Sequence, residues 1–220
     1  MIKRLGRKLT DGLAARLEFD YACNRGHSFG EYYLHGTVNE IISANIDPSK
    51  MRVHAGYAHR AIAREKPGRG RQPELDFYVK SRAGTLANVC AEVKWADSSH
   101  AKAGNVLRDL LRLALVKQSE PSTECLFILA GRMAKVESLL STPPVAAASK
   151  DERRLLEYPR AERAPRKRAF PLVVDGESIE SISKGTERFS GLPETIHTTL
   201  VTPTTIGTKR WQALVWRVTI

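Results

Sequence analysis

The chain of 220 residues lacks several features that would assign it to a membrane or secreted class. It has no run of about 18 apolar residues, so the sequence predicts no transmembrane helix. Its basic start lacks the apolar core of a secretory signal peptide. The three cysteines, Cys23, Cys90 and Cys125, form no CxxC pair, which argues against a structural zinc site and a disulfide framework. We therefore expect a protein of the reducing cytoplasm, with Cys90 and Cys125 as small core residues.

Several common catalytic signatures are also missing. There is no GxxxxGK[ST] phosphate loop and no GxSxG nucleophile elbow. His54 and His59 do not have the spacing of an HExxH zinc helix. The sequence thus argues against P-loop ATPase, α/β-hydrolase and zincin chemistry, and we interpret both histidines as strand or loop residues.

What the chain has in excess is positive charge. Lys and Arg number 35 against 24 Asp and Glu, which gives a formal net charge of +11. An excess of this size favours a polyanionic partner. Nucleic acid is favoured over a membrane surface because no strongly amphipathic basic helix accompanies the charge. A basic face kept for solubility is the alternative interpretation.

One cluster of this charge is placed informatively. The segment REKPGRGRQP, residues 64–73, is a loop punctuated by Gly and Pro that leads directly into a strand-like segment carrying an acid. A flexible basic loop at that point would hold a phosphate backbone beside the acid. We predict nucleic-acid binding by this loop and by a lysine further along the chain: Arg64, Lys66, Arg69, Arg71 and Lys102.

The most informative stretch is PELDFYVKSRAGTLANVCAEVKW, residues 73–95. Polar and apolar residues alternate over 75–80 and 89–95, which predicts two strands, and the segment between them fits a turn. Side chains two apart on a strand share a face, so Glu92 and Lys94 point the same way. Antiparallel pairing would bring Asp76 beside them. We expect the apolar members to face the core on the other side.

These residue types suit a site for a hard divalent cation. Oxygens of Asp76 and Glu92, with the backbone carbonyl of Val93, are ligands that Mg²⁺ accepts, and Mn²⁺ is an alternative. A bound ion lowers the pKa of a water and neutralises charge on a phosphate. Lys94 would position that water or help to deprotonate it. The competing interpretation is a cross-strand salt bridge on a solvated sheet face.

Asp76 in PELDFYV and Glu92-Val93-Lys94 in AEVKW resemble the motif of the PD-(D/E)xK nuclease superfamily, which has the restriction-endonuclease-like fold. The proline–aspartate step of the family is not intact, since Pro73 stands three residues before Asp76. The resemblance covers about residues 29–131 and holds at superfamily level. It implies a metal-dependent endonuclease, first of all on double-stranded DNA, that leaves 3′-hydroxyl and 5′-phosphate ends. A non-cleaving nucleic-acid-binding or assembly module and RNA cleavage remain alternatives, and a homodimer would suit two cuts on antiparallel strands.

The resemblance also implies a helix, three strands, a helix and a strand around a mixed central sheet flanked by helices. The sequence supplies them in order: residues 29–45 and 101–118 have helical periodicity, and residues 53–58 and 124–130 indicate strands beside the two of the motif. On the second helix, Arg108, Asp109 and Arg112 are predicted to lie elsewhere on the surface of the helix than its apolar stripe. We predict an α/β protein in which one nuclease-like domain spans residues 1–220.

The C-terminal third is predicted in less detail. Residues 141–168 indicate a loop and a charged excursion, and residues 169–174 a strand. Residues 195–202 and 211–219 predict a C-terminal β-hairpin, which extends the sheet or forms a small subdomain. Trp211 and Trp216 fall on opposite faces of the last strand, so we expect at most one of them to be fully buried.

Many members of this superfamily add a glutamate from the first helix to the metal site. Glu31 lies three residues before Leu34, on the apolar side of the predicted helix, whereas Glu40 lies about 200° round the helix from Val38 and faces solvent. An inward carboxylate is costly without a partner or a metal, which favours Glu31 as the functional acid. The alternative is that Glu31 only complements the helix dipole.

Overall fold

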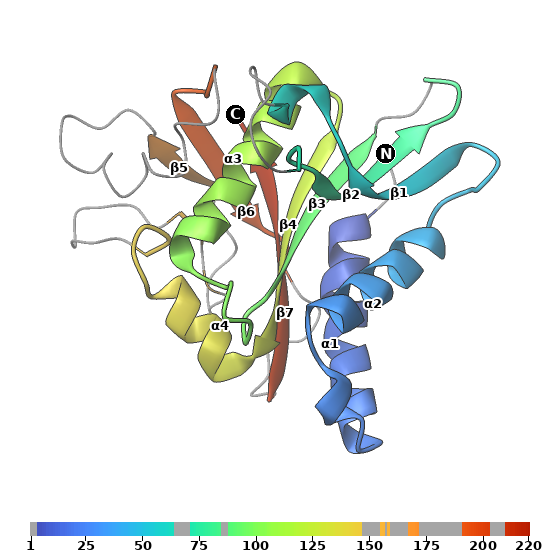
Figure 1. The fold of residues 1–220 in the computed structure, drawn as a ribbon, viewed down its shortest axis with the longest axis vertical. Helices are drawn as coiled ribbons and strands as arrows, with labels where there is room; N and C mark the ends of the chain where they lie inside the picture. Colours follow the sequence, from blue (N-terminus) through green and yellow to red (C-terminus); the bar gives the residue numbers. More distant parts are fainter. Residues whose placement is uncertain are drawn as a thin grey trace.

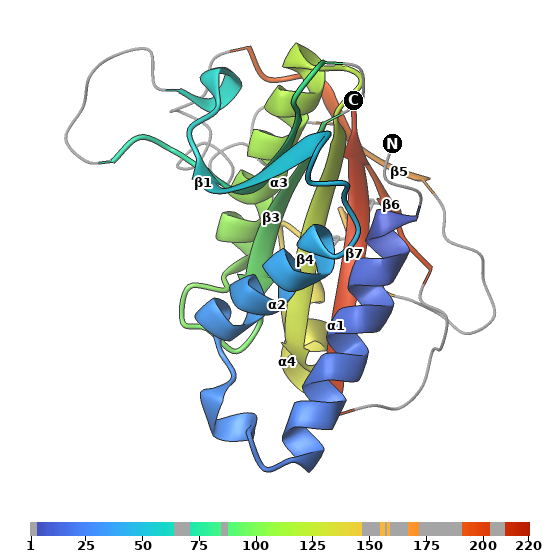
Figure 2. The ribbon, with the colours of Figure 1, turned by 90° about the vertical axis from the view of Figure 1, so that its right-hand side faces the viewer.

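A single mixed sheet of seven strands, in the order β1-β2-β3-β4-β7-β6-β5, organises the computed structural model (Figure 1). The structure describes residues 4–63, 71–84, 88–146, 155–156, 158, 167–171, 191–202 and 210–220. Helices cover both faces of the sheet, two on each (Figure 2). The predicted class, mixed α/β with a central sheet flanked by helices, is confirmed.

The elements follow one another in the predicted order over the middle of the chain. They are α1 (Leu5–Ala22), η1 (Gly26–Ser28), α2 (Glu31–Ser43), β1 (Met51–Tyr57), η2 (Arg60–Ile62), β2 (Leu75–Ser81), β3 (Val89–Trp95), α3 (Ala103–Ser119), β4 (Glu124–Arg132), α4 (Met133–Leu140), β5 (Lys167–Pro171), β6 (Thr195–Leu200) and β7 (Trp211–Thr219). The strands β1, β2 and β3 pair antiparallel, and α3 crosses over to β4, which is parallel to β3. The predicted C-terminal hairpin extends this sheet, since β7 pairs antiparallel with both β4 and β6.

Helix α1 was not predicted, although its pattern is in the sequence. Leu5, Leu9, Leu13 and Leu17 recur every four residues, are fully buried and belong to the core that includes Val215 of β7. Basic residues stand between these leucines, so the segment is conspicuous for its charge although its leucines have helical periodicity. Helix α4 was also not predicted. None of the described helices is long and apolar enough to cross a membrane.

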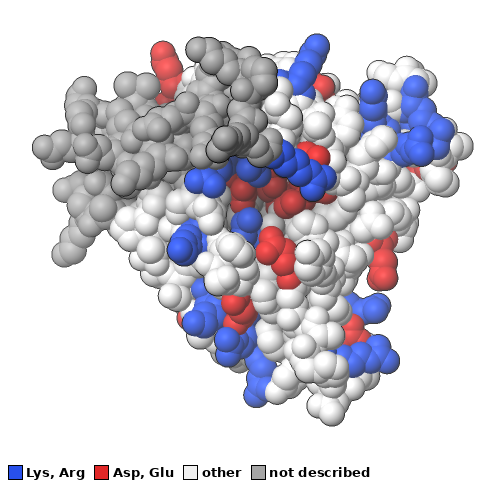
Figure 3. All heavy atoms as spheres, viewed as in Figure 1, with Lys and Arg blue, Asp and Glu red and all other residues white. Residues whose placement is uncertain are grey.

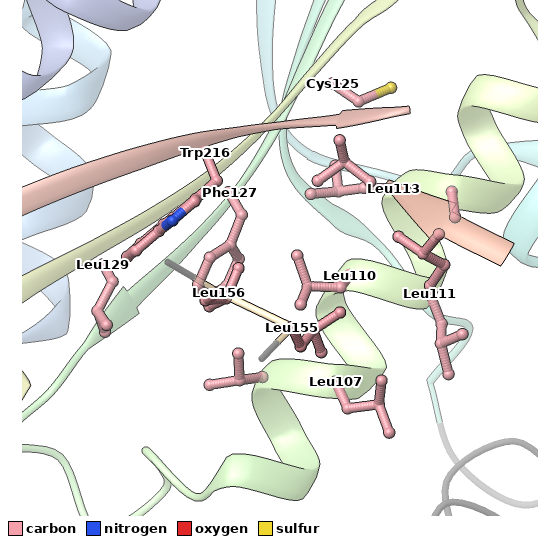
Figure 4. Close-up of a cluster of buried hydrophobic side chains, with 14 of the residues drawn as sticks. Leu107, Leu110, Leu111, Leu113, Cys125, Phe127, Leu129, Leu155, Leu156 and Trp216 are labelled. Atoms are coloured by element: carbon pink, nitrogen blue, oxygen red, sulfur yellow. The ribbon is translucent and has the colours of Figure 1, made fainter. Parts of the chain in front are cut away.

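Two hydrophobic cores lie on the two faces of the sheet. The first, under α3 and α4, includes Leu110, Phe127 and Trp216 (Figure 4). The second, under α1 and α2, includes Trp211. The two tryptophans therefore lie on opposite faces, as predicted. Trp216 is fully buried, at 0% exposure, and Trp211 keeps 7%, which agrees with the expectation that at most one would be fully buried.

The covered faces also change how the motif strands are interpreted. On β3, Val89, Ala91 and Val93 face the second core, and Cys90 belongs to the first core. The face that carries Glu92 is thus packed against α3. The interpretation of the motif as a salt bridge on a solvated face is therefore wrong, and any charge on this face needs a partner. Cys90 and Cys125 are buried free thiols, as predicted for small core residues.

The partly buried carboxylate of Glu120, directly after α3, connects the end of this helix to the sheet. Glu120 accepts hydrogen bonds from the Tyr78 hydroxyl at 2.7 Å, the Thr123 hydroxyl at 2.8 Å and Nε2 of His59 at 3.1 Å. Burial alone would raise the pKa of Glu120, but these donors outweigh it and lower the pKa to about 2. The unfolded chain therefore binds the proton of this group more tightly than the folded chain does.

Replacing Glu120 by Gln is expected to lower the free energy of unfolding by roughly 1–2 kcal/mol at pH 7, less than the full linkage value because the side chain is partly solvated. A lowered pKa stabilises the fold above the ordinary value of 4.5, and this stabilisation is lost as the pH falls towards about 2. The difference between the two proteins should shrink over that window in urea titrations. Glu40→Gln, at an exposed position, is the control and should leave the curve unchanged. Parallel curves for wild type and Glu120→Gln would contradict the assignment.

Candidate functional site

The two motif strands separate at Asp76. The ladder between β2 and β3 runs from Val79 opposite Val89 to Phe77 opposite Ala91. One residue further on, Oδ2 of Asp76 accepts a hydrogen bond from the backbone N–H of Val93 at 2.7 Å. A side-chain carboxylate thus takes the place of a main-chain acceptor. This contact holds the Asp76 carboxylate against β3 at the level of Glu92 and Lys94.

Glu92 is the most deeply placed acid of the site, at 1% exposure. Its Oε1 atom is buried, has no hydrogen-bond partner among the described residues, and lies 3.5 Å from Nη1 of Arg112 on α3. Burial, followed by repulsion from Asp109 and Asp76, raises the pKa of Glu92 well above its usual value. Arg112 opposes this shift without cancelling it. The site therefore contains a carboxylate that the protein alone leaves poorly compensated.

Lys94 lies between two carboxylates from different helices. Its Nζ atom is 3.0 Å from Oδ2 of Asp109 on α3 and 4.0 Å from Oε1 of Glu31 on α2. Burial lowers the pKa of Lys94, but the attraction of Asp109 and Glu31 outweighs it and the pKa is raised. Lys94 is therefore an ammonium group at neutral pH. In this state it can donate hydrogen bonds but cannot accept a proton.

The prediction that the polar residues of α3 lie away from its apolar stripe is wrong for Asp109. Asp109 is buried, and the side chain of Arg112 is 22% exposed. Asp109 stands three residues after Val106 and four before Leu113, so it lies on the inward stripe of the helix. For Asp109, burial outweighs the attraction of Lys94 and Arg112 and raises the pKa, while for Lys94 attraction wins. The short distance between the two groups leads us to treat them as an ion pair.

Helix α2 contributes from the opposite side. Glu31, in its first turn, points its carboxylate towards Lys94, while Glu40 has a 67% exposed side chain 4.0 Å from Arg16. His35, one turn after Glu31, was not predicted as a site residue. Its Nε2 atom is buried, has no hydrogen bond to a described residue, and lies 3.9 Å from Oδ2 of Asp76. The spacing of four residues from Glu31 is the sequence signal that would have indicated it.

On the surface, acidic atoms gather in a hollow beside α3, with Lys and Arg atoms around it (Figure 3). Of the basic residues predicted to bind nucleic acid, Arg64, Lys66 and Arg69 lie outside the described residues. Arg71 is exposed and pairs with Glu74 at 2.8 Å. Lys102 is exposed at the start of α3. The structure thus places two of the five, and only Lys102 lies on an element that borders the site.

The donor set of the site fits a hard cation in its chemistry. Among the described residues, no three His, Cys, Asp or Glu side chains are arranged to hold a metal ion. Mg²⁺ needs fewer, because one or two carboxylates with waters and a substrate phosphate suffice. Asp76 and Glu92 are such a pair, and the unpartnered Oε1 of Glu92 is an oxygen that a cation would satisfy. Scans against protein-family models, curated proteins and solved structures found no match to the chain.

Proposed function

We propose that the chain is a metal-dependent endonuclease of the PD-(D/E)xK type, with a restriction-endonuclease-like fold, that hydrolyses phosphodiester bonds in double-stranded DNA. The observation that carries this proposal is the state of Glu92. Its Oε1 atom is buried, accepts no hydrogen bond from a described residue, and lies close to Asp76 and in the same site as Lys94. A buried carboxylate that lacks compensation destabilises a protein, so its presence favours a ligand that supplies positive charge.

In this proposal Asp76 and Glu92 hold Mg²⁺ or Mn²⁺, with the carbonyl of Val93 as a further oxygen. The bound ion supplies a water of lowered pKa and charge for the phosphate. Asp76 is preorganised for its part because the N–H of Val93 fixes one of its oxygens. Glu92 is preorganised because its side chain is buried on β3, 3.5 Å from Nη1 of Arg112 on α3.

Lys94 is a hydrogen-bond donor in the proposed reaction. As an ammonium group between Asp109 and Glu31, it can orient the attacking water or stabilise charge on a phosphate oxygen. Its raised pKa favours this part over proton abstraction. Glu31 is the proposed helix acid, and it acts by positioning Lys94. Its carboxylate is half-exposed, so it can also contact a water of the site.

Two features outside the site support a polyanionic substrate. The net charge of +11 favours association with nucleic acid. The element order α2, β1, β2, β3, α3, β4 is the one that the resemblance to the superfamily implies. The alternative function, a nucleic-acid-binding module that does not cleave, predicts binding with a steep salt dependence and no cut product.

The proposal predicts cleavage that depends on a divalent ion. Supercoiled DNA, linear DNA and single-stranded RNA are incubated with wild type in Mg²⁺, Mn²⁺ or EDTA, and products are followed on gels. Supercoiled DNA is expected to be nicked or linearised with Mg²⁺ or Mn²⁺ and left intact in EDTA. Asp76→Ala and Lys94→Ala should each lower the rate by about 100-fold, as for groups that act directly on the reacting atoms. Asp47→Ala, in an exposed turn, is the control.

Three outcomes separate the interpretations. If no substrate is cut with either metal, or if both variants cut as fast as wild type, this site is not a nuclease centre. If DNA is bound but not cut, the alternative module is supported. If only RNA is cut, the chemistry stands and the substrate assignment is wrong.

A further inference from the structure

Two arginines on α3 border the site and carry donors that the described part of the chain leaves without acceptors. The Nε atoms of Arg108 and Arg112 are both buried and lack a hydrogen-bond partner. Nη1 of Arg112 lies 3.5 Å from Glu92 and 3.4 Å from Asp109, whereas Arg108 has no ion pair with a described residue. Buried polar groups without partners are rare in folded proteins and call for an explanation.

The helix brings these two donors together. Residues four apart on an α-helix are neighbours on one side of it, so the two guanidinium groups lie one turn apart. Like charges at this spacing destabilise a helix unless an anion lies between or beside them. Of the described acids beside Arg112, Asp109 also pairs with Lys94, and Glu92 lies 3.5 Å from Nη1 of Arg112 but forms no hydrogen bond with its Nε. The acids of the described residues thus leave Arg108 without an ion pair and the Nε atoms of both arginines without an acceptor.

The charges of the site favour an anion as the missing group. Its described acids are Glu31, Asp76, Glu92 and Asp109, and its described cations are Lys94, Arg108 and Arg112. The site alone therefore has one negative charge in excess when all are ionised. A divalent cation on the carboxylates changes this to one positive charge in excess. A single phosphodiester would neutralise it.

We infer that Arg108 and Arg112 form a phosphate-binding subsite on α3, which holds a nucleic-acid phosphate beside Asp76 and Glu92; this rests on the proposed function. The planar guanidinium matches two oxygens of a phosphate at once, and it does so better than an ammonium group. Arg108 takes its ligand wholly from the substrate. Arg112 contacts Glu92 and Asp109 in the free protein and turns its Nε donor to the phosphate. The subsite adds a contact to the substrate that the residues of the PD-(D/E)xK pattern do not provide.

Binding is measured without cleavage, so the subsite is tested separately from the chemistry. The full chain is titrated into a fluorescein-labelled DNA duplex in EDTA, and again in Ca²⁺, at several salt concentrations. Arg108→Gln is expected to bind about 10-fold more weakly at low salt, with a slope of log K against log[salt] that is smaller by about one. Arg7→Gln, on α1, removes the same charge from an exposed pair with Asp11 and is the matched control. Its affinity should change by less than about twofold.

A variant that keeps the charge tests whether the planar guanidinium group, with its two parallel donors, is required. Arg112→Lys keeps a cation beside Glu92 and Asp109, so thermal unfolding should show a folded protein. It is expected to bind about fivefold more weakly with an unchanged salt slope, because it keeps the charge and loses the fork. The subsite is overturned if wild type does not bind the duplex, or if Arg108→Gln and Arg112→Lys bind like Arg7→Gln. The outcomes for the two proposals differ. Weak binding by Arg108→Gln supports the subsite even where wild type cuts nothing, and unchanged binding refutes it even where wild type cuts.

Discussion

Replacing Glu92 by Gln is expected to abolish metal-dependent cleavage and at the same time to stabilise the metal-free fold. Glutamine keeps the size of the side chain and removes a carboxylate that is buried beside Asp76 and Asp109. Loss of a ligand oxygen with its charge should lower the rate of DNA cleavage by about 1,000-fold. Removing a buried, poorly compensated acid should raise the free energy of unfolding by roughly 1–2 kcal/mol at pH 7.

The pH dependence of stability gives the sign of this effect. The pKa of Glu92 is raised in the fold, so between the ordinary value of 4.5 and the higher folded value the folded state binds more protons than the unfolded state. Wild type therefore loses stability as the pH rises through this window. The Glu92→Gln variant lacks this titration, so its advantage should be small below pH 4.5 and should grow above it. Urea titrations at a series of pH values measure the difference.

Metal addition provides the complementary measurement. An ion that binds only the folded state raises the melting temperature with its concentration, so wild type should be stabilised by Mg²⁺ or Mn²⁺. Glu92→Gln should show little of this shift. Glu124→Gln is the matched control, since Glu124 is a buried acid on the adjoining strand that pairs with Arg217 at 3.0 Å. It should keep the metal response and the cleavage rate. A Glu92→Gln protein that is less stable than wild type, or that responds equally to metal, would contradict our account of Glu92.

The sequence predicted the fold where local pattern and tertiary structure agree. The period-two alternation around Asp76 and Glu92 predicted β2 and β3, and the stripe of Val106, Leu110 and Leu113 predicted α3. What alternation could not predict was the cover on the second face of the sheet. A strand that is buried on both faces still alternates when one face carries functional polar residues.

The candidate site was predictable where its residues share one segment of chain, and at Glu31, whose place on the inward side of a predicted helix indicated it. Asp76, Glu92 and Lys94 lie within nineteen residues, and their spacing is a recognisable pattern. Asp109, Arg112 and His35 reach the site because their helices pack against the sheet. Their distance in sequence from Asp76, Glu92 and Lys94 does not indicate this. Asp109 and Arg112 were predicted to lie away from the apolar stripe of the helix, and charged residues are rarely buried without partners. Their partners are on β3, and a sequence does not show that β3 and α3 meet.

Replacing one partner of the Lys94–Asp109 ion pair is expected to lower the free energy of unfolding more than replacing both partners together. Asp109→Asn leaves the ammonium group of Lys94 buried with only the carboxylate of Glu31, 4.0 Å away. Breaking a buried pair by removing one partner destabilises proteins by about 3–5 kcal/mol, so we expect a loss near the lower end because Lys94 retains Glu31. Lys94→Gln likewise leaves the buried carboxylate of Asp109 without its ammonium partner. Nη1 of Arg112, 3.4 Å from Asp109, still compensates part of that charge.

The double variant decides whether the two groups act as a pair. Lys94→Gln combined with Asp109→Asn buries two neutral side chains of similar size, and replacing a buried ion pair is often nearly neutral. Its free energy of unfolding should therefore lie within about 1 kcal/mol of wild type, which gives a coupling energy of at least about 2 kcal/mol in a double-mutant cycle. The exposed pair of Arg7 and Asp11 is the control, since Asp11→Asn should cost less than about 1 kcal/mol.

The pH dependence of cleavage shows whether Asp109 only stabilises the fold or also sets the pKa of Lys94. Asp109 is the largest cause that raises the pKa of Lys94, so Asp109→Asn should lower that pKa. If Lys94 acts as an ammonium donor, the variant should lose cleavage activity as the pH rises, at a lower pH than wild type does. The full pH–rate profile is needed because a merely structural loss would reduce the rate equally at every pH. A profile that keeps its shape, together with additive losses of stability, would show that Asp109 neither holds nor tunes Lys94.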